Sequence, residues 1–181
     1  MKRLGILVLY LLLAIVAAGL FGAVHDQISY SVSPEYFTRF KFLQFHLSDS
    51  PLPERLRVAL VGVMASWWMG IPLGLFAGMA GLIQRSAAQM LRALLWSLPA
   101  LVGFTLAVAL IGLLYGVIQT RNFDMNAYAG WYIPRALENP RRFLCAGYMH
   151  NAAYIGGALA IPAAWVFHIL CRRRWTRRPL Q

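Results

Sequence analysis

Residues 17–45 read AAGLFGAVHDQISYSVSPEYFTRFKFLQF, and this stretch crosses from one environment into another. It begins as the end of a purely apolar run and then places His25, Asp26 and Gln27 side by side. Beyond Pro34, aromatic side chains alternate with cations. Aromatic side chains favour the headgroup level of a membrane, and Lys and Arg reach lipid phosphates while their stems lie on apolar surface. The stretch therefore predicts the end of a spanning helix followed by a segment at the membrane surface.

The composition of the whole chain supports the same interpretation. Of 181 residues, 60% are hydrophobic and 13% are charged, whereas a soluble domain has about 45–50% and about 25%. A spanning helix needs about 20 apolar residues, and four runs reach that length, at approximately 4–24, 56–83, 93–118 and 143–170. We expect an all-α integral membrane four-helix bundle in one transmembrane domain, with outer loops 25–55 and 119–142 and a tail 171–181.

The basic residues lie at the ends of these runs, and their distribution predicts the orientation. With the N-terminus inside, the inner segments hold nine cations and no acid: Lys2, Arg3, Arg85, Arg92, Arg172, Arg173, Arg174, Arg177 and Arg178. The other eight cations and all six acids fall outside. The short inner segments are the denser in Lys and Arg, as cytoplasmic loops are. We predict that both termini are cytoplasmic, and that the net charge of +11 does not indicate nucleic-acid binding, because no soluble basic face exists.

Residues 25–42, HDQISYSVSPEYFTRFKF, follow directly after the first run. This segment resembles the signature segment of a family of small bacterial four-span integral membrane proteins. The resemblance implies the four-span fold and a place in the bacterial cell envelope, and it implies no activity. The first run also shares features with a secretory signal, but at about 20 residues it exceeds the usual apolar core of about 7–15. We expect it to be retained as a span.

Three segments begin with a polar residue followed by proline, which is typical of a helix start: Ser33-Pro34, Ser50-Pro51 and Asn139-Pro140. The first predicts a short helix over residues 34–47, with one face made of Tyr36, Phe40, Leu43 and Leu47. We expect this helix to lie in the outer interface, with Arg39 and Lys41 reaching lipid phosphates. An extended chain with Phe40 and Phe42 on one face is the alternative.

Small residues recur at every fourth position in three of the runs. The second run carries Gly62, Ser66, Gly70, Gly74 and Gly78. The fourth carries Ala152, Gly156, Ala160 and Ala164, and the first carries Ala14, Ala18 and Gly22. Spanning helices associate by close backbone approach and dispersion, so such faces predict tight packing.

Prolines stand inside three of the runs, at Pro72, Pro99 and Pro162. Each removes a backbone hydrogen bond and tends to kink its helix. Ordinary curvature within a bundle is one interpretation, and a gate or a lined cavity is the other.

Polar residues gather toward the outer ends of the first and fourth runs, at His25, Asp26 and Gln27 and at His150 and Asn151. If these two spans are neighbours, the two histidines face each other. Two imidazoles can ligate a metal ion or a haem, and a carboxylate can orient one of them.

Two further residues, Met149 and Cys145, would add soft ligands suited to copper. No H-x-x-x-H or C-x-x-C spacing accompanies the histidines. The alternative is a buried hydrogen-bond network that ties the two helices together, in which Arg39 or Arg141 is a candidate partner for Asp26.

Three functional hypotheses follow. The leading one is a non-enzymatic membrane subunit or scaffold that associates, through its glycine-rich faces, with itself or with a larger complex. The second is a transporter or channel for a small solute, although no Asp, Glu or Lys lies at the centre of a span. The third is a metal- or haem-binding redox protein that uses His25 and His150. No cofactor is favoured over the others, and we expect Arg172, Arg173 and Arg174 to contact anionic phospholipid headgroups of the bilayer.

Overall fold

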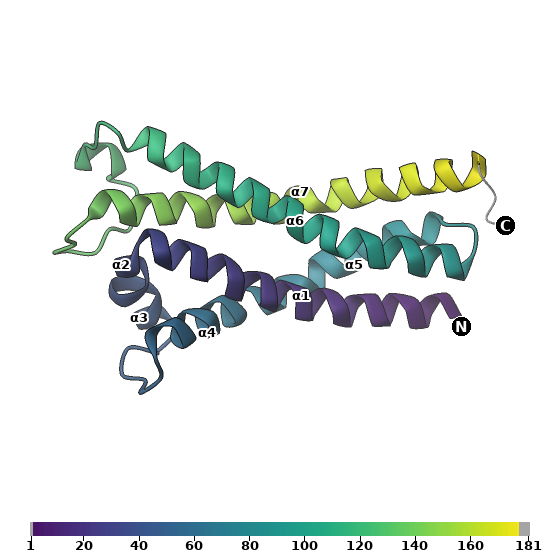
Figure 1. Ribbon diagram of the computed structural model, residues 1–181, viewed down its shortest axis with the longest axis horizontal. Helices are drawn as coiled ribbons and strands as arrows, with labels where there is room; N and C mark the ends of the chain where they lie inside the picture. Colours follow the sequence, from purple (N-terminus) through teal and green to yellow (C-terminus); the bar gives the residue numbers. More distant parts are fainter. Residues whose placement is uncertain (1, 178–181) are drawn as a thin grey trace.

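The computed structural model describes residues 2–177, and all the regular structure within them is helical. Four long helical segments run the length of the molecule (Figure 1): α1 (Lys2–Val32), α4 (Glu54–Ser66) continued by α5 (Gly70–Ala80), α6 (Ala87–Gln119) and α7 (Pro140–Arg177). Each segment is long and apolar enough to cross a membrane. The predicted all-α four-helix bundle is confirmed.

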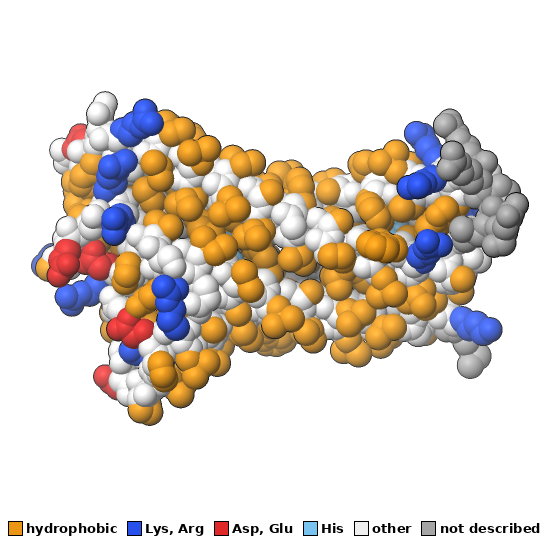
Figure 2. All heavy atoms as spheres, viewed as in Figure 1, with side chains coloured by type: hydrophobic (Ala, Val, Ile, Leu, Met, Phe, Trp, Pro, Cys, Tyr) orange, Lys and Arg blue, Asp and Glu red, His pale blue; other side chains and the backbone are white. Residues whose placement is uncertain are grey.

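The two ends of the bundle differ in structure and in charge. α1 begins and α7 ends at one end, which we call the terminal end, whereas the long connections 33–53 and 120–139 lie at the other, the loop end (Figure 1). On the face drawn in Figure 2, apolar side chains cover the middle, Lys and Arg gather at both ends, and Asp and Glu lie at the loop end. This banding is the pattern of a multi-pass membrane protein.

α1 packs tightly against the second span along small residues. That span carries the stripe Gly62, Ser66, Gly70, Gly74 and Gly78 on the side toward α1. A Cβ at Gly62 would collide with the backbone of Gly22, and a Cβ at Gly70 would lie 2.6 Å from the carbonyl oxygen of Ala14. Only glycine permits backbones to approach this closely. These faces are therefore filled within one chain.

α6 and α7 form a second tight pair. A Cβ at Gly112 would collide with the side chain of Ala152, and a Cβ at Gly156 would lie 3.0 Å from the Cβ of Val108. The bundle is thus built from two close pairs, α1 with α4 and α5, and α6 with α7 (Figure 1).

The prolines affect their helices differently. A 3₁₀ turn, η2 (Trp67–Met69), separates α4 from α5 just before Pro72. Pro72 has no N–H to donate to the carbonyl of Trp68, so the α-helical ladder is broken there. α6 and α7 run through Pro99 and Pro162 without interruption.

The segment after α1 is helical as predicted, but a different face is buried. It consists of α2 (Pro34–Tyr36), a π-helical turn η1 (Phe37–Lys41) and α3 (Phe42–Gln44). The π turn holds an extra residue and rotates the side chains that follow it. Phe42, just after the turn, is therefore buried together with Phe37 at its start, whereas Leu43 is 58% exposed. The segment closes the loop end of the bundle instead of laying the predicted aromatic face on lipid.

Polar caps fix the connections at the loop end. Ser33 Oγ accepts a hydrogen bond from the N–H of Tyr36, and Asn139 Oδ1 accepts one from Arg142. Ser50-Pro51 starts no helix, since α4 begins at Glu54. The carboxylate of Glu35 accepts from the backbone N–H groups of Glu138 at 2.8 Å and Asn139 at 2.9 Å, which joins the two long connections.

Candidate metal centre

α1 and α7 bring His25, Asp26 and His150 together inside the loop end of the bundle. The centroids of the two imidazole rings lie 4.6 Å apart, edge to face. The side chains are nearly excluded from solvent, at 3% exposed for His25, 4% for Asp26 and 9% for His150. One ligand atom from each residue can be chosen such that all lie within 4.8 Å of one another. Two imidazoles and a carboxylate therefore lie together in the interior of the bundle.

The hydrogen bonds of His150 fix its tautomer. Its Nδ1 lies 2.9 Å from the backbone carbonyl oxygen of Ala146. Because a carbonyl only accepts, Nδ1 carries a proton and donates it. Nε2 lies 3.2 Å from Oδ1 of Asp26, outside hydrogen-bond geometry. In the protonated ring this contact is an ion pair, and in the neutral ring Nε2 holds a lone pair that a metal ion can use.

His25 repeats this arrangement. Its Nδ1 lies 2.9 Å from Oδ1 of Asp26, so Nδ1–H donates to the carboxylate. Its Nε2 is buried and has no hydrogen-bond partner among the described residues. Buried polar atoms are nearly always satisfied, and an exception needs a cause. Such atoms also occur singly on Arg57, Gln84 and His168, whereas here two lie on the rings of a single cluster.

A cation held by the two Nε2 atoms would give both nitrogens a partner. Histidines that ligate a metal usually donate their other ring N–H to a backbone carbonyl or to a carboxylate, which fixes the tautomer and turns the lone pair toward the ion. His150 does the first through Ala146, and His25 does the second through Asp26. In this arrangement the two imidazoles would be the ligands and Asp26 would orient His25 without binding the ion itself, and imidazole suits a divalent first-row ion such as Zn²⁺ or Fe²⁺.

The same contacts argue against a haem. A haem iron with two histidine ligands has the porphyrin plane between the rings, whereas the rings of His25 and His150 already touch. The soft ligands expected for copper are also missing from the cluster. Cys145 Sγ lies 3.5 Å from Thr120 Oγ1 on the α6 side, and Met149 does not line the cavity beside the cluster.

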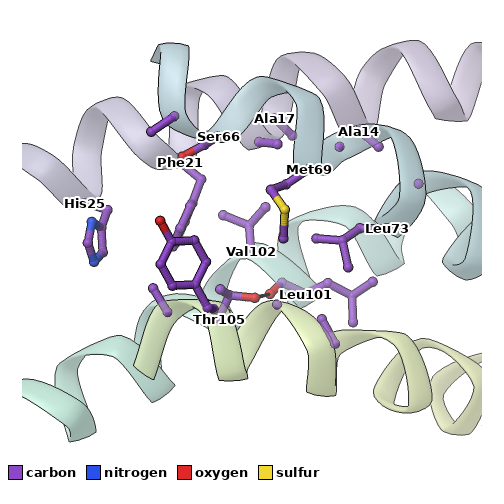
Figure 3. Close-up of a pocket in the computed structure, with 18 of the residues that line it drawn as sticks. Ala14, Ala17, Phe21, His25, Ser66, Met69, Leu73, Leu101, Val102 and Thr105 are labelled. Carbon is purple, nitrogen blue, oxygen red and sulfur yellow. Dashed lines mark hydrogen bonds between the residues drawn. The ribbon is translucent and has the colours of Figure 1, made fainter. Parts of the chain in front are cut away.

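That cavity, of about 130 Å³, lies between the two helix pairs and adjoins the cluster. Figure 3 shows His25 at one end and Met69, Leu73 and Leu101 farther along. Most of the lining is apolar. His25, Asp26 and His150 all contribute to its wall, so the cluster opens into an apolar space.

Lys41 also lines this cavity, and its position differs from the predicted one at the lipid surface. The side chain is 8% exposed, and Nζ donates to Oε1 of Gln44 at 3.0 Å. Burial lowers the pKa of the Lys41 ammonium, and the nearby charge of Asp26 partly opposes this. The π turn directs Lys41 inward, a change that α-helical spacing does not predict.

Tyr36 closes the cluster from the side of the loop segment. The centroid of its ring lies 4.6 Å from that of His150. Burial raises the pKa of the Tyr36 hydroxyl well above its usual range, so it remains neutral. Sequence analysis placed Tyr36 on a membrane-facing stripe, and periodicity alone gives no signal for its contact with His150.

The other residues singled out in the sequence lie outside the cluster. Gln27 Nε2 donates to the backbone carbonyl of Arg55 at 2.8 Å, and Asn151 is exposed. Arg141 Nε donates to Thr120 Oγ1 at 3.2 Å, and Arg39 is exposed, so neither arginine pairs with Asp26. At the terminal end, Arg172, Arg173 and Arg174 are exposed, and residues 178–181 of the predicted tail lie outside the described residues.

The four long apolar helices and the buried cluster define a multi-pass membrane protein with a candidate metal centre. Comparison of the chain with protein-family models, curated proteins and solved structures finds no match. The function is therefore inferred from the site.

Proposed function

We propose that this protein binds one divalent transition-metal ion through His25 and His150, with Asp26 orienting His25, and that it acts as a metal-dependent protein of the bacterial inner membrane with both termini in the cytoplasm. The observation that carries the proposal is the buried pair of imidazoles around one carboxylate, in which the Nδ1 of each ring is held and neither Nε2 makes a well-formed hydrogen bond. A metal ion supplies the missing partner, and Asp26 offsets part of its charge.

The alternatives have less support. A scaffold that associates through its glycine-rich faces would need those faces on the surface, but Gly62 and Gly70 are covered by α1 of the same chain. A partner complex would have to use other surfaces. A pathway for a polar solute would need a polar lining, and the cavity between the helix pairs is mostly apolar.

The direct test is the metal content of the purified protein. Protein purified without chelators and measured by elemental analysis is expected to hold about one ion per chain. His150→Phe keeps a planar ring of similar size but has no lone pair, and Asp26→Asn removes the charge. Each should weaken metal binding by at least about tenfold.

Asn151→Ala is the matched control, since Asn151 is the exposed neighbour of His150. It should bind metal as the wild type does. The proposal is overturned if the folded wild type, dialysed against Zn²⁺, Fe²⁺ or Mn²⁺, binds no ion, or if His150→Phe binds as much as Asn151→Ala does.

A further inference from the structure

The cavity beside the cluster is long and narrow. Along α1 its wall runs from Tyr10 to Asp26, a distance of about 24 Å at the rise of an α-helix. Its volume is about 130 Å³, close to that of a cavity that holds a single benzene ring, about 150 Å³. Such a volume spread over such a length is a slot between the helix pairs, and it suits an unbranched chain better than a ring system.

The chemistry of the slot changes along its length. Its middle is lined by apolar side chains, including Met69, Leu73 and Leu101 (Figure 3). At the loop end its wall contains the two histidines, Asp26 and Lys41. Flexible side chains such as Met69 can move to widen a gap at small cost. The slot therefore offers an apolar body and a polar end, which is the outline of an amphiphile.

The charge at the polar end selects the headgroup. The single charges of Lys41 and Asp26 cancel, so a divalent ion adds positive charge that no other described side chain in the slot offsets. An uncompensated charge in a low-dielectric interior is costly. Lys41 has a further attraction for an anion, because among the described residues its ammonium makes one hydrogen bond, to Gln44, of the three that it can donate.

The slot is also open to the surroundings of the bundle. Tyr154 forms part of its wall and is 51% exposed, on a surface that in a membrane faces lipid. A ligand dissolved in the bilayer can enter there without passing through water. The entrance thus favours a molecule that already resides in the membrane.

We propose that the slot binds a single-chain anionic amphiphile, a long-chain carboxylate, with its alkyl chain between the helix pairs and its carboxylate beside Lys41 and the metal ion. The proposal rests on the proposed metal site and names the class of ligand that the site receives. The ligand is thus a free fatty acid, since an acyl group esterified in a larger lipid carries no carboxylate.

The test separates the chain from the headgroup. The protein is purified in a steroid-based detergent, which has no alkyl chain, and its binding of decanoate and of decanol is measured by native mass spectrometry, which reports bound metal on the same particles. The zinc-loaded wild type should bind decanoate more tightly than decanol. Lys41→Met should weaken the binding of decanoate by about tenfold, the loss expected for one hydrogen bond to a charged group. The binding of decanol should stay unchanged.

Val102 lines the slot and is labelled at its centre in Figure 3. Val102→Phe should fill the slot and abolish the binding of both ligands while the zinc content stays at that of the wild type. Val16→Phe is the matched control, because Val16 is 59% exposed and faces away from the slot. It should bind both ligands and zinc normally.

The outcomes separate the two proposals. Zinc binding without any decanoate binding overturns the ligand proposal and leaves the proposed metal site intact. Equal binding of decanoate by the wild type, Val102→Phe and Val16→Phe overturns the assignment of the slot as the binding site. Absence of zinc in the folded wild type overturns the proposed function, and the ligand proposal falls with it.

Discussion

Gly62→Ala should separate α1 from α4. An added Cβ meets the backbone of Gly22 on the neighbouring helix, and backbone, unlike a side-chain tip, cannot rotate away. Overpacking a tight contact costs about 1–3 kcal/mol, whereas replacing Gly by Ala inside a helix gains about 1 kcal/mol. Because the obstacle is backbone, we expect the upper part of the steric range, about 2–3 kcal/mol, and a net loss of about 1–2 kcal/mol in the free energy of unfolding.

The control for this variant is Gly103→Ala on α6, where a Cβ has no neighbour within 4 Å. Only the gain in helix propensity applies there, so stability should be unchanged or slightly higher. The assay is reversible unfolding in mixed micelles, followed by circular dichroism. Because His25 lies about one turn beyond Gly22 on α1, Gly62→Ala should also weaken zinc binding. Equal stability of the two alanine variants would refute the packing argument.

Three further predictions concern the loop end and the orientation of the chain. Glu35→Ala should lower stability by about 1–3 kcal/mol, because two backbone N–H groups lose a charged acceptor; Glu138→Ala is the control, and equal thermal unfolding of the two would contradict the prediction. Because burial lowers the pKa of Lys41 in the folded protein, the unfolded chain binds more protons in the pH range below about 10.4, and stability should rise with pH there. The stability of Lys41→Met should rise less with pH than that of the wild type, and parallel plots of stability against pH would show that Lys41 is not the cause. A membrane-impermeant maleimide should label Cys171, at the terminal end, in inside-out vesicles only, while the buried Cys145 stays unlabelled; labelling of Cys171 in right-side-out vesicles would reverse the predicted topology.

The sequence alone predicts the parts of this structure that depend on local pattern. The length of the apolar runs indicates four spans. The small residues at every fourth position from Gly62 to Gly78 lie on the side toward α1. The depth of His25 and His150 along their runs also places the two rings at the same level. These features follow from helix geometry, which fixes the height and the face of each residue.

What the sequence could not predict depends on contacts between distant segments. The π turn over Phe37–Lys41 moves Lys41 from the expected lipid surface into the bundle, and the spacing of residues in the sequence does not predict such a turn. The proton on Nδ1 of His150 depends on the carbonyl of Ala146. The slot is a gap left where the two tight helix pairs pack against each other. The sequence contains several candidate partners for Asp26, and only the packing of α1 on α7 selects the histidines.

The most direct test of the metal centre is X-ray absorption spectroscopy at the zinc edge of the zinc-loaded protein. The account predicts a first shell of nitrogen and oxygen at about 2.0–2.2 Å, with the outer-shell scattering of two imidazole rings, and it predicts the loss of one ring's contribution in His150→Phe. A first shell that contains sulfur, or one of water oxygens without imidazole scattering, would contradict it.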